Sequence, residues 1–169
     1  PEIIPTKSGE TLLTTNRNNS LLRFSIQKYI PGKPANRQNL NHIFAAGKAL
    51  AQLHCALIKF DSQGKLAQLP RWGELNKIHP LITNPLEVPQ LLNLEQSQQQ
   101  QLVQIFQELI EIVPNLYKAL PLQTTHADYL CPNVLIENNC VNGIIDFEFA
   151  TYDLRLLDFI AALDHFSRI

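Results

Sequence analysis

The chain has 169 residues, of which 45% are hydrophobic and 17% are charged, and its formal net charge is −1. This composition is typical of a globular domain with a sizeable core, and the near-neutral charge gives no electrostatic reason to expect nucleic acid or an anionic membrane as a partner. No apolar run approaches the roughly 20 residues that span a bilayer.

The first 30 residues predict short strands. The segments "GETLLTT" (9–15) and "SLLRFSIQKYI" (20–30) are rich in aliphatic and β-branched residues, and the polar "NRNNS" between them predicts a turn. The segment "PGKP" (31–34) then ends the pattern, because its two prolines disfavour helix or ladder continuation. It marks a boundary between a small β-rich piece and a larger helical one.

Helical patterns dominate the middle of the chain. Apolar residues recur at three- and four-residue intervals from Asn39 to about Lys59, which predicts a helix with Asn36 or Asn39 as its N-cap. Residues 60–94 contain prolines and little periodicity, and predict mostly loop. A second helix is expected from about residue 94 to residue 113, with the glutamine run 98–101 as its solvated start.

The last part of the chain changes period. Residues 133–136 and 141–146 predict two short strands joined by the polar turn 137–139. Asn142-Gly143 is a competing hairpin signal, which leaves the register open. A final helix is expected from about Leu154. Cys55, Cys131 and Cys140 have no C-x-x-C spacing, so reduced thiols and a cytoplasmic location are expected.

Polar residues with a fixed spacing surround the predicted hairpin. His126 and Asp128 begin an H-x-D-x-x-x-x-N pattern that ends at Asn133, and Asp146 follows just before Phe147. This is the spacing of a phosphoryl-transfer loop. An Asp at the loop tip can accept the proton of an attacking hydroxyl. An Asn oxygen and a second carboxylate, returned by the hairpin, can bind Mg²⁺.

The stretch 125–163, "THADYLCPNVLIENNCVNGIIDFEFATYDLRLLDFIAAL", resembles the aminoglycoside phosphotransferase, choline kinase and homoserine kinase superfamily, relatives of protein kinases that phosphorylate small molecules. The segments "GKALAQLH" (47–54) and "KYIPGKP" (28–34) resemble that superfamily's helix after the hinge and the hinge itself. The tail and the opening "PEIIPTKSGE" look most like homoserine kinases. The resemblance implies an α+β, protein-kinase-like fold. Residues 1–30 would be a partial β-rich N-lobe ending at the hinge, and residues 31–169 a mainly helical C-lobe with a short catalytic β-hairpin.

The resemblance also implies roles for individual residues. Asp128 would be the catalytic base, and Asn133 and Asp146 the Mg²⁺ ligands. His126 would brace the catalytic loop, and Asp158 would be a buried acceptor that holds the backbone of this loop. At the hinge, the backbone of three residues would meet the adenine edge of ATP: Lys28, Tyr29 and Ile30.

Some positions depart from the superfamily pattern. Ala127 stands where the small-molecule kinases usually have Gly, which is tolerable unless the residue needs positive φ. Glu148 is a possible substrate or metal contact. No glycine-rich phosphate loop precedes the hinge, and no strand lysine with a helix glutamate partner, so the resemblance implies that these lie upstream of residue 1. The chain begins without Met and ends in an uncapped apolar pattern, and truncation is expected at both ends.

Other polar residues have simpler explanations. His54 is expected to be a packed or capping histidine, and a nucleophilic pair with Cys55 is disfavoured because adjacent helical residues point about 100° apart. Three cations near the hinge, Lys28, Lys33 and Arg37, are expected to be solvated charges, and Trp72 an anchor for the long loop.

The resemblance implies an ATP- and Mg²⁺-dependent phosphotransferase acting on a small-molecule hydroxyl. Homoserine is the favoured acceptor, with an aminoglycoside or amino-alcohol next, and the fragment itself is expected to be inactive. The alternative is a truncated or degenerate pseudokinase that acts only as a binding module. The missing lysine and phosphate loop favour it if Pro1 begins the natural protein, whereas the intact Asp128, Asn133 and Asp146 set argues against it. No nucleic-acid or membrane partner is expected, and the oligomeric state is open.

Overall fold

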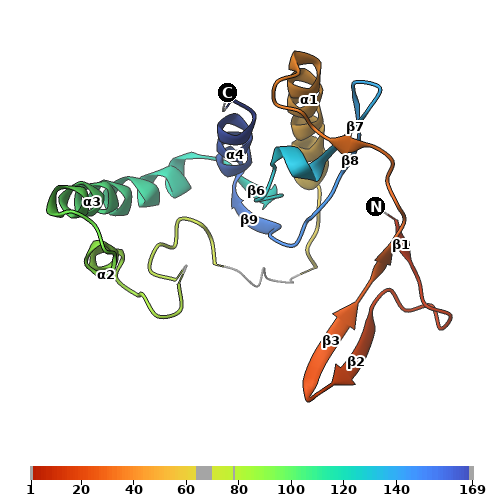
Figure 1. The fold of residues 1–169 in the computed structure, drawn as a ribbon, viewed down its shortest axis with the longest axis horizontal. Helices are drawn as coiled ribbons and strands as arrows, with labels where there is room; N and C mark the ends of the chain where they lie inside the picture. The colour runs from red at the N-terminus through yellow and green to blue at the C-terminus, as the bar shows by residue number, and fades with distance from the viewer. Residues whose placement is uncertain (1, 64–69, 78, 168–169) are drawn as a thin grey trace.

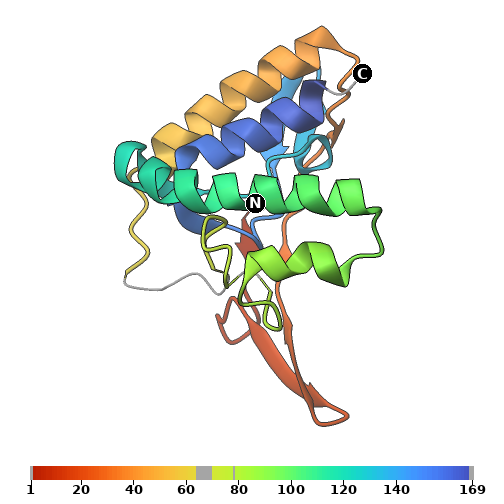
Figure 2. The same cartoon turned by 90° about the vertical axis from the view of Figure 1, so that its left-hand side faces the viewer.

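The computed structural model describes residues 2–63, 70–77 and 79–167. Its N-terminal strands form two small antiparallel pairs, which extend away from the helices in Figures 1 and 2. Strand β1 (Ile3–Ile4) pairs with β4 (Ile26–Gln27), and β2 (Leu13–Arg17) pairs with β3 (Ser20–Phe24). The predicted strand at 9–15 is therefore shifted toward the turn, and the predicted strand at 20–30 divides into two.

The turn of the first hairpin explains this shift. Asn18 and Asn19 both have positive φ, 51° and 62°, and the strands close directly around them with Arg17 opposite Ser20. A two-residue turn of this kind matches the twist of the flanking strands, and asparagine tolerates its left-handed backbone better than most residues.

The first long helix, α1 (Leu40–Leu57), is close to its prediction. The side chain of Asn39 accepts a hydrogen bond from the backbone N–H of Asn41, which confirms one of the two expected N-caps. The loop region that follows contains a short 3-10 turn, η1 (Pro85–Glu87), and a one-turn helix, α2 (Val88–Leu91).

The second long helix, α3 (Gln96–Ala119), extends beyond its predicted end at residue 113. Pro114 follows this predicted end, and a proline within a helix removes a hydrogen bond and crowds the preceding turn. The structure instead carries Pro114 inside a continuous helix.

A three-stranded sheet joins the hinge region to the predicted hairpin. Its order is β5 (Lys33–Pro34), β7 (Val134–Glu137) and β8 (Cys140–Ile144), and the 3-10 turn η2 (Cys131–Asn133) leads into β7. The expectation that the segment 31–34 would not continue a ladder is wrong. Pro34 is tolerated because β5 is an edge strand, where a missing N–H need not break a central ladder.

Two strands were missed by the sequence reading. They are β6 (Leu122–Thr125) and β9 (Thr151–Leu154), which pair with each other beneath α4 (Arg155–Ser167). Their buried positions include polar side chains: Gln123, Thr125, Thr151 and Asp153. Because this pair buries polar residues, the usual alternation of apolar inside and polar outside gives no signal here.

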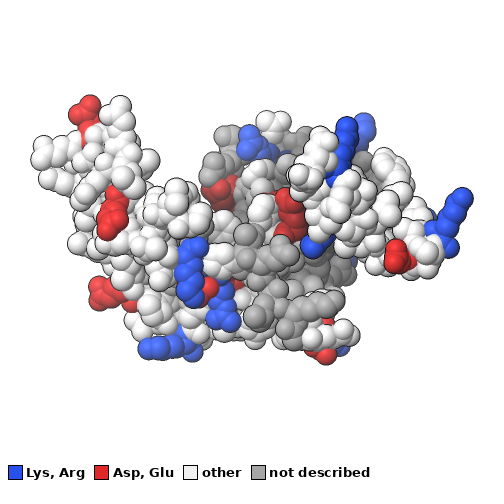
Figure 3. Space-filling view, turned by 90° about the horizontal axis from the view of Figure 1, so that it is seen from below, with Lys and Arg blue, Asp and Glu red and all other residues white. Residues whose placement is uncertain are grey.

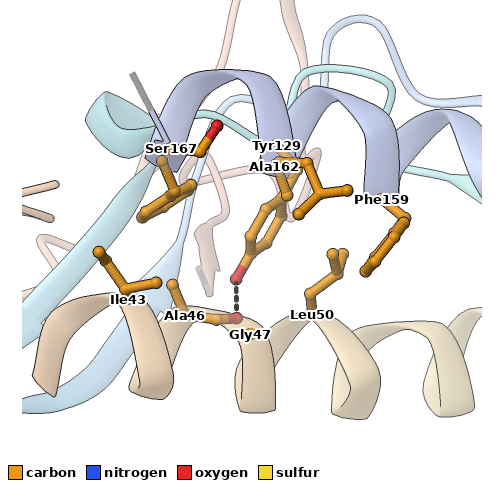
Figure 4. A pocket seen from close by; sticks show the side chains of 10 residues that line it. Ile43, Ala46, Gly47, Leu50, Tyr129, Phe159, Ala162 and Ser167 are labelled. Atoms are coloured by element: carbon orange, nitrogen blue, oxygen red, sulfur yellow. Dashed lines mark hydrogen bonds between the residues drawn. The ribbon is translucent and has the colours of Figure 1, made fainter. Parts of the chain in front are cut away.

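The core lies where α1 packs against β8 and α4, and where α4 contacts η2, the turn that leads into β7. Figure 2 shows the two helices side by side. Tyr129, Val134 and Leu50 are buried in this core. An apolar pocket of about 280 Å³ opens between α1 and α4 (Figure 4), lined by Ile43, Ala46, Gly47, Leu50, Tyr129, Phe159, Ala162, Leu163, Phe166 and Ser167.

Charge is mixed on the face seen in Figure 3, where acidic and basic side chains are interspersed among the described residues. Within the described ranges, no helix combines the length and apolar character needed to cross a membrane.

Candidate active site

The loop after β6 brings Asp128 and Asn133 into direct contact. Nδ2 of Asn133 donates to a carboxylate oxygen of Asp128 at 2.7 Å and to the Asp128 carbonyl oxygen at 2.9 Å. The 3-10 turn η2 closes the five-residue spacing between them, with the Asn133 N–H bonded to the Leu130 carbonyl. Since the amide nitrogen of Asn133 is committed to Asp128, its Oδ1 is the atom left for another ligand.

His126 braces this loop from inside the protein. Its side chain is fully buried, its Nδ1 accepts from the Asp128 N–H at 3.2 Å, and its Nε2 lies 3.0 Å from the Ile145 carbonyl oxygen. These partners assign a neutral ring with the proton on Nε2, donated to Ile145. The ring of Phe147 lies 4.4 Å from the His126 ring, centroid to centroid. His126 therefore connects the loop tip to the segment that carries Asp146.

Asp146 follows β8, and a backbone hydrogen bond across the hairpin brings its neighbour Ile145 next to Asn133. The Ile145 N–H donates to the Asn133 carbonyl at 3.0 Å, which extends the β7–β8 ladder to the residue before Asp146. Asp146 has φ of 68°, a conformation that costs a non-glycine residue free energy and that recurs at functional sites. Its side chain is exposed and makes no hydrogen bond or ion pair with a described residue.

The donor set suits a divalent cation bound together with phosphate. No group of three or more His, Cys, Asp or Glu side chains that could hold a metal occurs in the part of the chain that the structure describes. Mg²⁺, however, is commonly held by one or two protein carboxylates plus substrate phosphates and water. The Asn133 amide oxygen and the Asp146 carboxylate are hard oxygen donors of the right kind, so these residues fit such an ion.

Asp158 holds the backbone of the loop from the first turn of α4. One of its oxygens accepts the Ala127 N–H at 2.7 Å, and the other accepts the His126 N–H at 2.9 Å. The Asp158 side chain is fully buried. The geometry is that of the buried acceptor that the resemblance implies. Ala127 has φ of 63°, so this position does need positive φ, and alanine costs free energy here where glycine would not.

His54 is a site residue whose role the sequence reading missed. Its Nε2 donates at 3.0 Å to the Asp158 oxygen that also accepts the His126 N–H, across 104 positions of the chain. Cys55 beside it is exposed, whereas His54 bonds to the buried Asp158, so the two side chains point in different directions. The signal available was the resemblance of the segment "GKALAQLH", whose last residue is His54, to the helix that follows the hinge in the family.

Tyr129 anchors the loop to α1. Its hydroxyl donates to the Ala46 carbonyl at 2.8 Å (Figure 4), and burial, together with the nearby Asp158 charge, raises the pKa of this phenol well above its usual value.

The predicted hinge residues differ in how their backbones are used. The Lys28 N–H donates to the Glu2 carbonyl at 2.8 Å, so it is not available to a ligand. The backbone groups of Tyr29 and Ile30 form no hydrogen bond with another described residue. Tyr29 is 79% exposed, whereas the Ile30 side chain is partly buried against β8.

The remaining candidates lie outside this network. Glu148 is exposed in the turn after Phe147. Trp72 anchors its loop through the main chain, because its N–H donates to Asp153 at 2.9 Å while its side chain is 51% exposed. Asp153 is fully buried and also accepts a hydrogen bond from the Tyr117 hydroxyl. Burial and this hydrogen bond raise the pKa of Tyr117 to about 12.

Comparison with known proteins agrees with this geometry. A family model described as "Phosphotransferase enzyme family" matches residues 4–169. Among curated proteins, the homoserine kinase of Phenylobacterium zucineum is 28% identical over 145 residues, which are 83% of this chain and 40% of that protein. The homoserine kinase of Afipia carboxidovorans is 26% identical over 165 residues, which are 97% of this chain and 46% of that protein. The chain thus spans less than half the length of these relatives.

Solved structures confirm the fold class. An aminoglycoside phosphotransferase from Alicyclobacillus acidocaldarius superposes with a TM-score of 0.60 at 20% identity, covering 97% of this chain and 52% of that one. A thermostable mutant of aminoglycoside phosphotransferase APH(4)-Ia, in a ternary complex with ADP and hygromycin B, gives a TM-score of 0.61 at 17% identity and covers 90% of this chain and 53% of that one. The predicted α+β, protein-kinase-like fold and the resemblance to homoserine kinases are confirmed.

Proposed function

Because this chain belongs to the phosphotransferase enzyme family, we propose that its full-length protein transfers the γ-phosphate of ATP to a hydroxyl group of a small molecule. The observation that carries the proposal is the Asp128 carboxylate held at 2.7 Å by Asn133, whose carbonyl accepts the N–H of Ile145, the residue before Asp146. Phosphoryl transfer needs little covalent work from the protein, so positioned oxygen groups of this kind supply most of what the reaction requires.

Asp128 is the proposed catalytic base. Asn133 fixes the orientation of its carboxylate through Nδ2, which leaves the other carboxylate oxygen to accept a hydrogen bond from the acceptor hydroxyl and then its proton. His126 and Asp158 are positioning residues, since they bond to the loop backbone and are too deeply buried to reach a substrate.

Asn133 Oδ1 and the Asp146 carboxylate are the proposed Mg²⁺ ligands. A bound Mg²⁺ would neutralise charge on the ATP phosphates. The positive φ of Asp146 supports this role, because strained backbone at an exposed carboxylate with no partner among the described residues indicates a functional constraint. The adenine end of ATP is proposed to bind at the hinge, where the backbone groups of Tyr29 and Ile30 form no hydrogen bond with another described residue.

Homoserine is the first acceptor to test, since the curated relatives named above are homoserine kinases. Aminoglycosides and amino-alcohols come next, because the chain shares its fold with aminoglycoside phosphotransferases.

The test compares Asp128→Asn with wild type in the full-length protein, by an ADP-release assay over a panel of hydroxyl acceptors. We expect kcat to fall by about 10²- to 10⁴-fold, the usual contribution of a general base. The melting temperature should stay nearly unchanged, because Asp128 is only partly buried. Asp61→Asn, which changes a surface carboxylate outside the site, is the matched control. A full-length protein that binds Mg-ATP but phosphorylates no acceptor in the panel would refute the enzyme and leave a binding module.

The binding-only alternative rests on the sequence of these 169 residues, which contains no glycine-rich phosphate loop before the hinge. For the same reason we expect the 169-residue fragment alone to show negligible transfer, because the β- and γ-phosphates would lack most of their positive surroundings. Strong ATP-dependent transfer by the isolated fragment would contradict this expectation.

A further inference from the structure

We propose that Asn142 and Gly143 of β8 fix the hinge to the hairpin that carries the proposed metal ligands, and so set where the nucleotide base binds relative to its phosphates. The inference rests on the proposed function, because it takes residues 28–30 as the nucleotide-binding hinge. It adds two positioning residues, neither of which is among the residues given a catalytic, metal-binding or nucleotide-binding role above.

Asn142 contacts the hinge directly through its side chain. Its Nδ2 donates to the Pro31 carbonyl oxygen at 2.8 Å, across 111 positions of the chain, and more weakly to Glu137 at 3.3 Å. The register of the hairpin explains how the side chain reaches Pro31. Leu135 pairs with Gly143 and Ile136 with Val141, which leaves Asn142 as the extra residue of a bulge. A bulge changes the direction of a side chain and recurs beside active sites.

Gly143 lets the hinge approach β8 closely. A Cβ atom at this position would lie 2.7 Å from Cγ2 and 2.9 Å from Cδ1 of Ile30. Real Cβ atoms do not come so near, so the Ile30 side chain occupies space that only a glycine leaves open. Gly32, with φ of 134°, makes a similar approach to β7, since a Cβ atom at this position would lie 3.1 Å from the Ile136 carbonyl oxygen.

The hinge is therefore held at consecutive residues. Ile30 packs on Gly143, Pro31 accepts from Asn142, Gly32 lies against β7, and the ladder of β5 with β7 follows at once. The same hairpin begins directly after Asn133 and ends two residues before Asp146. One two-stranded unit thus sets the separation between the base-binding hinge and the cation ligands, both of which a bound nucleotide must reach.

The test uses Asn142→Ala in the full-length protein, with Glu137→Ala as the matched control. The first variant removes both hydrogen bonds of the Asn142 side chain, and the second removes only the one within the hairpin. Asn142 is exposed, so the variant should fold. We expect amide hydrogen exchange to quicken at Lys28 and Ala35, whose N–H groups are hydrogen-bonded on either side of the hinge. The KM for ATP should rise by about twofold to tenfold, which is the effect of losing one hydrogen bond. The KM for the acceptor and kcat should stay the same, and Glu137→Ala should resemble wild type in every measurement.

Gly143→Ala tests the other contact between β8 and the hinge, since the added methyl group must displace Ile30. It should raise the KM for ATP without changing the KM for the acceptor. Unchanged hinge exchange in Asn142→Ala would overturn the inference, as would faster exchange with an unchanged KM for ATP. A wild type that binds no ATP would instead refute the proposed function. A wild type that binds ATP, with both variants binding it equally well, would refute this inference alone.

Discussion

Ala127 and Asp146, one on each side of the candidate site, both have left-handed backbone. For an ordinary L-residue this conformation costs about 1–2 kcal/mol relative to the right-handed one. The surroundings hold Ala127 in place through the Asp158 carboxylate, which accepts its N–H at 2.7 Å. The local cost is therefore offset by a hydrogen bond to a buried charge.

This strain makes a prediction for Ala127→Gly. Glycine removes the left-handed penalty but gains entropy in the unfolded chain, so the variant should be more stable by about 0.5–1 kcal/mol. Urea unfolding would measure the gain. Ala51→Gly, at an exposed position within α1, is the control and should lose about 1 kcal/mol. A loss of stability in Ala127→Gly would mean that the methyl group makes a needed contact.

Tyr117→Phe tests the buried Asp153 contact. The variant loses the hydroxyl that donates to Asp153 and accepts from the Gly73 N–H, and should be less stable at pH 7 by about 1–3 kcal/mol. The folded pKa of Tyr117, about 12, lies above the ordinary tyrosine value of 10.0. Its contribution is therefore complete below pH 10 and is lost as the pH rises toward 12.

Unfolding measured between pH 8 and pH 12 should show the wild-type advantage over Tyr117→Phe shrinking above pH 10. Tyr29→Phe, at a position 79% exposed, should match wild type throughout. An advantage that does not change with pH would disprove the coupling between the phenol and Asp153.

Among the elements, α3 shows a conflict between local preference and observed structure. Pro114 lies inside this helix, none of whose described residues is buried. Little tertiary burial is therefore present to offset the lost backbone hydrogen bond.

Pro114→Ala should strengthen α3, because it restores the N–H and removes the ring clash. We expect a gain of about 1–3 kcal/mol in helix stability, read as slower amide exchange at residues 110–118. Pro80→Ala, outside any helix, should slightly destabilise or leave the protein unchanged. Faster exchange in the Pro114 variant would show that the proline fixes a bend that the surroundings require.

The β7–β8 hairpin shows how an element can have two local signals and one outcome. Both turn candidates contain asparagine, but Asn138 and Asn139 form the turn, with φ of 51° and 59°. Asn142 and Gly143 lie in the strand. The Asn142 side chain bonds to Pro31, and Gly143, which has no side chain, leaves room for Ile30. A turn at 142–143 would forgo both contacts with the hinge.

At the scale of the whole molecule, Asp158 joins parts that are distant in sequence. It lies in α4. Its carboxylate accepts a hydrogen bond from His54 of α1 and hydrogen bonds from two backbone N–H groups of the loop that carries Asp128. A carboxylate is suited to this position because it is acceptor-only and can serve several donors at once.

Asp158→Asn should therefore destabilise the protein by about 2–4 kcal/mol, since an amide nitrogen would face N–H donors inside the core. Urea unfolding gives the magnitude, and Asp61→Asn at the surface should change it by less than about 0.5 kcal/mol. If activity fell while stability held, Asp158 would position the loop without supporting the fold.

The sequence by itself determined the local features. The apolar period and Asn39 located α1, and the H-x-D-x-x-x-x-N spacing located Asp128 and Asn133, because both signals depend on residues only a few positions apart. The family resemblance supplied the fold class for the same reason, since its motif is nearly continuous from residue 125 to residue 163.

Only the tertiary structure decided the rest. It buried the polar faces of β6 and β9, paired His54 with Asp158, and turned Asn142 toward the hinge. In each case the partner lies far away along the chain, and a polar group becomes favourable to bury only once that partner satisfies its hydrogen bonds. Periodicity reports the transfer of apolar surface out of water, and it contains no information about which distant polar groups will meet.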